Sequence, residues 1–572
     1  MFLIASIISK KIRNYKYYYY YYYTESKRIN GKPTLVNQKY LGTAEKVLEK
    51  VRTAELPLQE RVLYSDAADF GAVALLYDIA CRLGLADIIN DLVPKRKQGA
   101  TVGAYILTAA INRATNPSSK NGLAEWYSDT CLPMITGIKP TAFTPQNFWN
   151  NTCTAAEELD KIEDAILERM LDTYDIDTTQ IIYDATNFFT YIDTMQDSEL
   201  AKRGHSKEKR NDLRIVGLSM MVSPDHAIPL LHDTYPGNMS DAKEFPIMVK
   251  KLKARYEAIT KRNTDITIVF DRGNNSEDNI ALLESFEVKL HYVGGLKKSQ
   301  ATELYKIDLC EYEPLLLRSL EGQLAYRTEM DVFGRRLDVV ITYNPELEEG
   351  QMQGILINIE KTNAKLLELQ QRLMRRSCGE ITKGKRPTME SVTDAVEKIL
   401  SVEYMRDIFL YEVLESNGNI HLVYRRSDDA LEEIRRVHLG KTVLFTDRKD
   451  FTNEQIVSAY RNAWHVEKSF KQMKNPKHLA VCPLFHWTDE KIRVHIFTCV
   501  QAYRLCCLLI RELDKMGITI SVDRMIDEMS RIKRIHTFFG DINKPEKVTS
   551  FTRGNDVAQQ IESVYRLKEK YS

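Results

Sequence analysis

Residues 180–191 read QIIYDATNFFTY, a run of β-branched and aromatic side chains with a single acid, Asp184, near its middle. This composition predicts a strand, because such side chains pack well on a pleated, half-buried surface. Two further strand-like runs follow at residues 216–222 and 227–232, and the residues between them read SPDH, which favours a turn. We therefore expect a strand carrying Asp184, followed by an antiparallel hairpin.

The chain then alternates between helical and strand patterns. Apolar spacing predicts a helix at residues 241–260, and a buried strand at 266–270 ends directly before Asp271. A helix that begins near Ser276 and a strand at 288–293 complete the order β-β-β-α-β-α-β. This order predicts an α/β fold with a ribonuclease-H-like core.

The bulk composition is that of a soluble globular protein, with 44% hydrophobic and 28% charged residues. The formal net charge is only +1, so a nucleic-acid partner would have to be recognised by local patches of charge. The nine cysteines show no Cys-x-x-Cys or Cys/His spacing, which indicates neither zinc nor a disulfide framework and suits a reducing cytosol. No apolar run approaches membrane length, so we expect a cytoplasmic protein without membrane contact.

Three carboxylates fall where metal-dependent chemistry would need them. Asp184 lies within the first strand, and Asp271 lies at the carboxyl end of the fourth, where open α/β sheets bind their ligands. Glu467 lies on an amphipathic helix predicted over residues 452–474, which opens with a capping box. Mg²⁺ prefers hard oxygen ligands and keeps several waters, so two or three carboxylates suffice to hold it. Each acid taken singly could be an ordinary turn or surface residue; their combination favours a catalytic set.

The helix also carries a family resemblance. Tyr460, Glu467 and Lys474 are spaced as in the Tyr-x2-Arg-x3-Glu-x6-Lys signature, and the segment resembles that of bacterial and archaeal insertion-sequence DDE transposases. The three residues are seven apart, so one helix face carries all of them. Further similar segments cover most of residues 15–535: YDATNFF around Asp184, GHSK at 204–207, PGNMSD at 236–241 and FDRGN around Asp271.

The resemblance implies a transposase that cuts DNA at element ends and joins the ends to target DNA. It implies that Asp184, Asp271 and Glu467 are both the catalytic and the metal-binding residues, with two Mg²⁺ (or Mn²⁺) ions. It also implies double-stranded DNA partners, namely terminal inverted repeats and target DNA, a homodimer on DNA, and a location with the nucleoid.

The resemblance also implies that Tyr460 and Lys474 hold DNA phosphate near the cut end. The other candidate DNA contacts are basic residues near the acids: Arg461, Lys471, His205, Lys207 and Arg272. The signature's Arg position is Ala463 in this chain, and Arg461 points about 200° away on a helix. Whether Arg461, Lys471 or another residue replaces it stays open. Two basic clusters, within residues 202–214 and 372–386, could follow DNA phosphates or could be solvated surface.

Length and pattern together predict several regions in these 572 residues. They are an N-terminal β-hairpin region (1–65), a helical DNA-binding domain (66–175), the first part of the core (176–296), a β-rich insertion (297–445), the second part of the core (446–535) and a helical C-terminal tail (536–572). The hairpin is expected from the tyrosine run at 17–23, the Asn30-Gly31 turn and the strand-like residues 35–41.

Other functions remain as alternatives. A ribonuclease-H-like endonuclease without strand transfer would share the three acids. Ala463 at the signature's Arg position suggests a second alternative, a DNA-binding protein that has lost its catalytic activity. A phosphatase with Asp184 as nucleophile would want a second acid two residues later, where Thr186 stands. A P-loop at residues 379–386 is rejected, because Arg386 stands where Ser or Thr is required.

Overall fold

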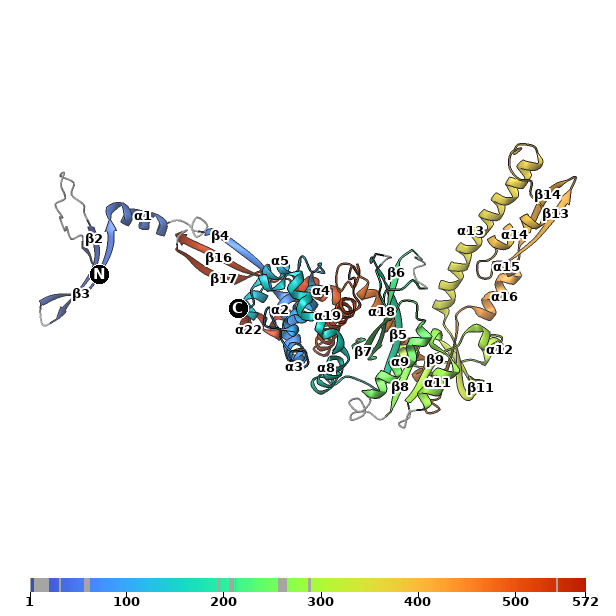
Figure 1. Cartoon of the computed structure of the whole chain (residues 1–572), viewed down its shortest axis with the longest axis horizontal. Coiled ribbons are helices and arrows are strands. Elements are labelled where there is room, and N and C mark those ends of the chain that lie inside the picture. Colours follow the sequence, from blue (N-terminus) through green and yellow to red (C-terminus); the bar gives the residue numbers. More distant parts are fainter. Residues whose placement is uncertain are drawn as a thin grey trace. The chain divides into compact units, whose positions relative to one another are not determined.

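The computed structural model describes residues 2–4, 20–29, 32–55, 62–193, 196–204, 210, 212–255, 265–285, 290–541 and 544–571. The chain forms two compact units (Figure 1). The first consists of Met1–Asp78, Ser118–Pro145 and Ile520–Ser572, and the second of Ile79–Pro117 and Gln146–Thr519. Helix α2 (Gly71–Leu83) passes from one unit to the other.

The first unit opens with the N-terminal hairpin that the sequence predicts. Strands β2 (Tyr20–Ile29) and β3 (Lys32–Thr43) pair antiparallel, with Ile29 opposite Lys32 at the turn. Strand β1 (Phe2–Ile4) adds to β2, and α1 (Ala44–Glu55) follows β3. The predicted hairpin is confirmed, although Tyr17–Tyr19 and the turn residues Asn30 and Gly31 lie outside the described residues.

A second sheet in this unit corrects the prediction of a helical tail. Strands β16 (Lys533–Asp541) and β17 (Lys544–Phe551) form a hairpin, and β16 also pairs with β4 (Val62–Asp69). The strands are rich in charged residues, and β4 lies far away in the sequence, so local patterns did not reveal them. The unit's helices are α5 (Leu123–Ser128), α6 (Leu132–Thr136), η2 (Pro140–Phe143), α20 (Val522–Met529), α21 (Asp556–Tyr565) and α22 (Leu567–Lys570).

The second unit is built on a nine-stranded mixed sheet with the order β10-β11-β12-β15-β9-β8-β5-β6-β7. Its strands are β5 (Gln180–Thr190), β6 (Arg214–Val222), β7 (Pro229–Pro236), β8 (Ile266–Phe270), β9 (Leu290–Gly295), β10 (Glu313–Pro314), β11 (Leu324–Val332), β12 (Arg335–Tyr343) and β15 (Lys441–Thr446). The neighbours β5, β8 and β9 are parallel, and the other pairs are antiparallel. The five strands predicted between residues 180 and 293 are thus confirmed.

Helices lie between and beside these strands. They are α3 (Leu85–Leu92), α4 (Val102–Thr115), α7 (Pro145–Thr152), η3 (Cys153–Glu157), α8 (Leu159–Thr173), α9 (Asp241–Ala254), η4 (Arg272–Asn274), α11 (Glu277–Glu284), η5 (Lys298–Gln300), α12 (Thr302–Tyr305), η6 (Leu309–Glu311), η7 (Arg318–Leu320), α17 (Asn453–Arg461), α18 (Ala463–Met473) and α19 (Asp489–Lys515). All five residues of β8 are buried, as expected for a central strand. Within the described part of the chain, α19 alone is long and apolar enough to cross a membrane, but its most apolar stretch is 94% buried, as in a core helix.

The predicted β-rich insertion has a different organisation. Its strands β10, β11, β12 and β15 extend the main sheet, while residues 345–439 form a mainly helical excursion, here called the arm. The arm contains α13 (Pro345–Ser377), α14 (Met389–Ile399), α15 (Met405–Ile408), the hairpin β13 (Phe409–Ser416) and β14 (Asn419–Arg426), and α16 (Asp428–His438). Figure 1 shows α14 and the hairpin beside α13, and their buried apolar side chains form a core of their own.

Candidate active site

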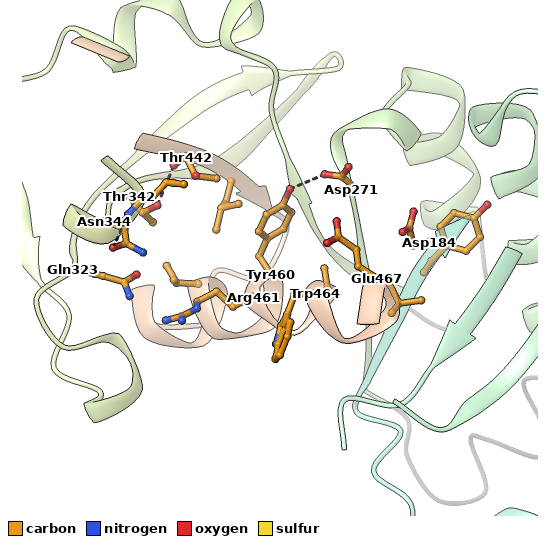
Figure 2. Close-up of a pocket in the computed structure, with 16 residues that line it drawn as sticks. Asp184, Asp271, Gln323, Thr342, Asn344, Thr442, Tyr460, Arg461, Trp464 and Glu467 are labelled. Carbon is orange, nitrogen blue, oxygen red and sulfur yellow. Dashed lines mark hydrogen bonds between the residues drawn. The ribbon is translucent and has the colours of Figure 1, made fainter. Parts of the chain in front are cut away.

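The three predicted acids line one cavity of about 510 Å³ (Figure 2). Asp184 lies within β5, and Asp271 directly follows β8. In the parallel pairing of these strands, Tyr183 lies opposite Phe270. The next residues, Asp184 and Asp271, therefore lie at the same position along the two strands. Asp184 is half-buried, whereas Asp271 is exposed to the cavity.

Glu467 reaches the same cavity from helix α18. The helix buries Val466, Phe470 and Met473 and packs across β5, which leaves Glu467 on its exposed side. The Tyr503 hydroxyl of α19 donates to the Ser469 hydroxyl at 2.8 Å and so helps to fix the helix. Figure 2 shows the Glu467 carboxylate between Asp271 and Asp184.

Tyr460 holds the second aspartate. Its hydroxyl donates to Asp271 Oδ1 at 2.9 Å, and burial together with the negative charge of Asp271 raises the pKa of Tyr460 above its ordinary value. Gly295 of β9 makes room for this contact, because a Cβ there would lie 2.5 Å from the Tyr460 hydroxyl. The family resemblance implies a phosphate contact for Tyr460, which stays a prediction; in this structure its hydroxyl contacts the Asp271 carboxylate.

The helix predicted over residues 452–474 is in fact two helices, which corrects the prediction. Helix α17 begins after the Thr452 and Gln455 capping box and ends at Arg461, and α18 starts at Ala463. Asn462 between them keeps a right-handed helical backbone (φ −61°, ψ −18°), so the apolar period runs on through the break. Periodicity therefore gave no sign of it.

The predicted DNA-contact residues fall into different surroundings. Arg461 lines the cavity and donates to the Ser319 carbonyl at 2.9 Å, while Lys474 lies over the Phe188 ring, 5.7 Å from its centroid. Lys471 is exposed on α18. Arg272 directly follows Asp271, and its positive charge lowers the pKa of Tyr460, against the larger effects of burial and Asp271. His205 and Lys207 lie outside the described residues.

Ala463 lines the cavity at the signature's Arg position, so a methyl group stands where the family has a cation. The sequence did not single out the polar, uncharged lining of the far side: Gln323, Thr342, Asn344 and Thr442. These residues come from β12, β15 and the segments beside them, whose place in the main sheet no local pattern revealed. Trp464, 55% exposed at the cavity with Lys468 Nζ 5.4 Å from its ring centroid, was also missed.

Described members of the two basic clusters line hollows other than the acid cavity. Lys202, Arg203 and Arg214 line a hollow beside the start of β6. Arg376 and Arg386 line another at the end of α13, together with the turn of the β13–β14 hairpin. Whether either binds DNA stays a prediction.

The chemistry of the donors fits a divalent cation. Within the described ranges, no three His, Cys, Asp or Glu side chains already stand close enough to hold a metal ion together. The carboxylates of Asp184, Asp271 and Glu467 nevertheless face one cavity and supply the hard oxygen atoms that Mg²⁺ or Mn²⁺ prefers. The residues present therefore suit such ions.

The chain was compared with protein families, curated proteins and solved structures. A family model described as "Transposase DDE domain" matches residues 176–499. No curated protein sequence matches. Among solved structures, a piggyBac transposase synaptic complex with hairpin DNA aligns over 80% of this chain and 78% of that one, with 9% identity and a TM-score of 0.34. Because the family model spans more than half of the sequence, the chain belongs to the family of proteins with a transposase DDE domain.

Proposed function

We propose that this protein is a cut-and-paste transposase in which Asp184, Asp271 and Glu467 hold two Mg²⁺ or Mn²⁺ ions and direct DNA cleavage and strand transfer. The observation that carries the proposal is the meeting of these three carboxylates in one cavity, although they come from a strand, a strand end and a helix far apart in the sequence. Membership of the DDE family supports the same assignment.

We also infer that β7-β6-β5-β8-β9 is a ribonuclease-H-like core. The support is the antiparallel β5-β6-β7 meander beside parallel β5, β8 and β9, with acids at equivalent levels of β5 and β8. The proposed partners are terminal inverted repeats and target DNA, handled by a homodimer in the cytoplasm at the nucleoid.

The proposed reaction has two balanced steps. In cleavage, a water oxygen bonds to phosphorus, the bond from phosphorus to the 3′ oxygen breaks, and a 3′-hydroxyl is released. In joining, that hydroxyl attacks a phosphorus of target DNA and displaces the target's own 3′ oxygen, which leaves with the proton. When bound, the metal ions neutralise phosphate charge and lower the pKa of the attacking water.

The protein's own groups orient this chemistry. Tyr460 fixes the Asp271 carboxylate by its 2.9 Å hydrogen bond, and Glu467 faces both aspartates across the cavity. Arg272, next to Asp271, is a cation placed to meet phosphate charge.

The test is cleavage and joining of labelled DNA that carries the element's own ends, with Mg²⁺ or Mn²⁺, by the wild type and Glu467→Gln. End-specific nicks and joined product are expected from the wild type, and both should disappear in the variant. Glu433→Gln, at an exposed glutamate of α16 outside the cavity, is the matched control and should stay active. Cleavage that persists without Glu467 would contradict the assigned site.

A second candidate, a DNA-binding protein that no longer cleaves, is favoured by one observation: Ala463 lines the cavity at the family's Arg position. Specific binding of element ends without cleavage by the wild type would support it. Nicks without joined product would instead indicate an endonuclease.

A further inference from the structure

Large aromatic side chains gather on the surface of the second unit beyond the end of β5. Phe485 and Trp487 are 63% and 62% exposed, and Tyr191 is 50% exposed. Tyr191 and Phe485 lie against each other with ring centroids 5.3 Å apart. Burying rings of this size is worth several kcal/mol, so a group of them left in water marks an interaction site.

A lysine stands among these rings. Lys491 Nζ lies 5.6 Å from the centroid of Trp487 and 5.9 Å from that of Trp149. We name the group of Trp149, Tyr191, Phe485, Trp487 and Lys491 the aromatic platform. It joins ring faces to a cation, the combination that binds unpaired nucleotides by stacking on bases and attracting phosphates.

The platform is mounted on rigid structure. The Tyr191 backbone N–H donates to the Leu484 carbonyl at 2.9 Å, so the segment before α19 is tied to the end of β5. Leu484 is fully buried, and Thr488 caps the N-terminus of α19. The backbone that carries Tyr191, Phe485 and Trp487 is therefore anchored at both Leu484 and the start of α19.

Two acids, Asp489 and Glu490, stand next to the single cation of the platform in the sequence. The Asp489 carboxylate accepts hydrogen bonds from the Ser198 hydroxyl at 2.6 Å and from the Glu199 backbone N–H at 2.8 Å. Glu490 is exposed and keeps a negative charge next to Lys491. Lys491 therefore attracts phosphate only at short range, and the rings supply most of the contact with a bound strand.

The platform lies beyond the end of the strand that carries Asp184. Asp184 and Phe188 lie on the same face of β5, and Lys474 stands over Phe188. Tyr191 follows seven residues after Asp184, about 20 Å along the extended chain. A strand leaving the cavity along β5 would reach the platform after several nucleotides.

We propose that the aromatic platform binds unpaired nucleotides of a DNA strand that extends from the cavity. The inference rests on the proposed function, because it assumes that DNA lies at the acids. Stacking does not depend on sequence, so the platform should accept any unpaired base and should discriminate against intact duplex.

The test measures binding of labelled oligothymidylate, and of a duplex of equal length, in EDTA, where neither metal nor cleavage is required. Phe485→Ala/Trp487→Ala should weaken oligothymidylate binding about ten-fold or more and leave duplex binding within about two-fold. Trp487→Phe should bind almost like the wild type and lose part of the quenching of tryptophan fluorescence that the oligonucleotide causes, because Trp149 of the platform remains. Lys491→Ala should weaken binding more than Lys515→Ala at the other end of α19.

Leu316→Ala, at an 86% exposed side chain elsewhere in the unit, is the control and should not change affinity. Wild-type affinity for oligothymidylate in the double alanine variant would overturn the proposal. A change in oligomeric state by light scattering, with unchanged oligothymidylate affinity, would also overturn it and assign the platform to an interface between copies. The platform is tested by binding in EDTA and the cleavage assignment by nicked and joined product, so failure of the one and failure of the other are separate results.

Discussion

At the scale of single residues, the Tyr460 hydroxyl links α17 to Asp271 at the end of β8. A carboxylate that binds a metal ion is usually held by a second residue in this way, and loss of that residue costs about 10–100-fold in metal affinity or activity. The contact crosses from α17 to the end of β8, so it also sets the distance between the two elements.

Tyr460→Phe should therefore lower the rate of cleavage by about 10–100-fold and shift the Mg²⁺ dependence to higher concentration, with DNA affinity little changed. The measurement is the cleavage rate against Mg²⁺ concentration. Tyr411→Phe in the arm, which removes a comparable hydroxyl-to-carboxylate bond to Glu397, is the matched control. If DNA affinity falls and the metal dependence stays the same, Tyr460 contacts phosphate instead.

A buried carboxyl makes the stability of the fold depend on pH. Glu244 of α9 is fully buried and accepts a 2.9 Å hydrogen bond from the Ser219 hydroxyl, and burial and nearby Asp233 raise its pKa to about 8. The folded protein thus keeps a proton that the unfolded chain loses above pH 4.5. The stabilisation is complete at low pH and is lost as the pH rises towards 8.

Glu244→Gln cannot ionise and should remove this dependence. Between pH 5 and 8 the free energy of unfolding of the wild type should fall relative to the variant, by at most about 1.4 kcal/mol per pH unit. Chemical denaturation at both pH values measures it, with Glu277→Gln, at an exposed glutamate of α11, as the control. Parallel pH profiles of wild type and Glu244→Gln would count against the buried proton.

At the scale of elements, α8, α19 and β7 meet at a buried ion pair. Arg504 is fully buried, its Nη1 lies 3.0 Å from Glu163 Oε1, and its Nε donates to the Pro229 carbonyl at 2.9 Å. His232 Nδ1 lies 3.1 Å from the other Glu163 oxygen. Removing one member of such a group leaves a buried charge without its partner.

Arg504→Met should lower the free energy of unfolding by about 3–5 kcal/mol, as measured by urea denaturation. The double variant Glu163→Gln/Arg504→Met should recover part of that loss, because it no longer buries a Glu163 carboxylate without its arginine partner. Equal losses in the single and double variants would show that packing of the arginine stem, and not its charge, carries the effect.

The sequence predicts elements well where one face or both are buried and less well where pairing partners are distant. The strand at 266–270 stood out because its apolar run ends directly before Asp271, and the strand at 180–190 because its β-branched and aromatic run holds a single acid, Asp184. Glu467 was located by the helical pattern and by the family resemblance of its segment. The β16–β17 hairpin did not stand out, because its partner β4 lies at the other end of the chain. The Tyr460–Asp271 bond and the aromatic platform depend on tertiary contacts that spacing along one helix cannot reveal.

At the scale of the whole molecule, the arm leaves and rejoins the sheet at one point. Tyr343 of β12 pairs with Lys441 of β15, and the Asn344 N–H donates to the Gly440 carbonyl at 2.8 Å. Deleting residues 345–439 would join Asn344 to Gly440, which gives the Asn-Gly sequence favoured in two-residue hairpins. Gly440 already has a positive φ of 71°, and asparagine tolerates the left-handed backbone that the turn requires.

The shortened protein should therefore fold, with cooperative thermal unfolding and the far-ultraviolet spectrum of a mixed α/β protein. The same deletion closed by Ala-Ala instead of Asn-Gly is the control and should be less stable. Aggregation of both forms would mean that the sheet depends on the arm.

The order of strands in the main sheet also governs when the protein becomes competent during its synthesis. Asp184 and Asp271 leave the ribosome early, but β15, which must pair with β9, and the helix bearing Glu467 are translated only after the whole arm. At about 5–20 residues per second, the nascent chain spends many seconds with two of its three acids and without one wall of the cavity. A chain that terminates within the arm would lack Glu467 and β15, so under the proposed function only a fully translated chain could cleave DNA.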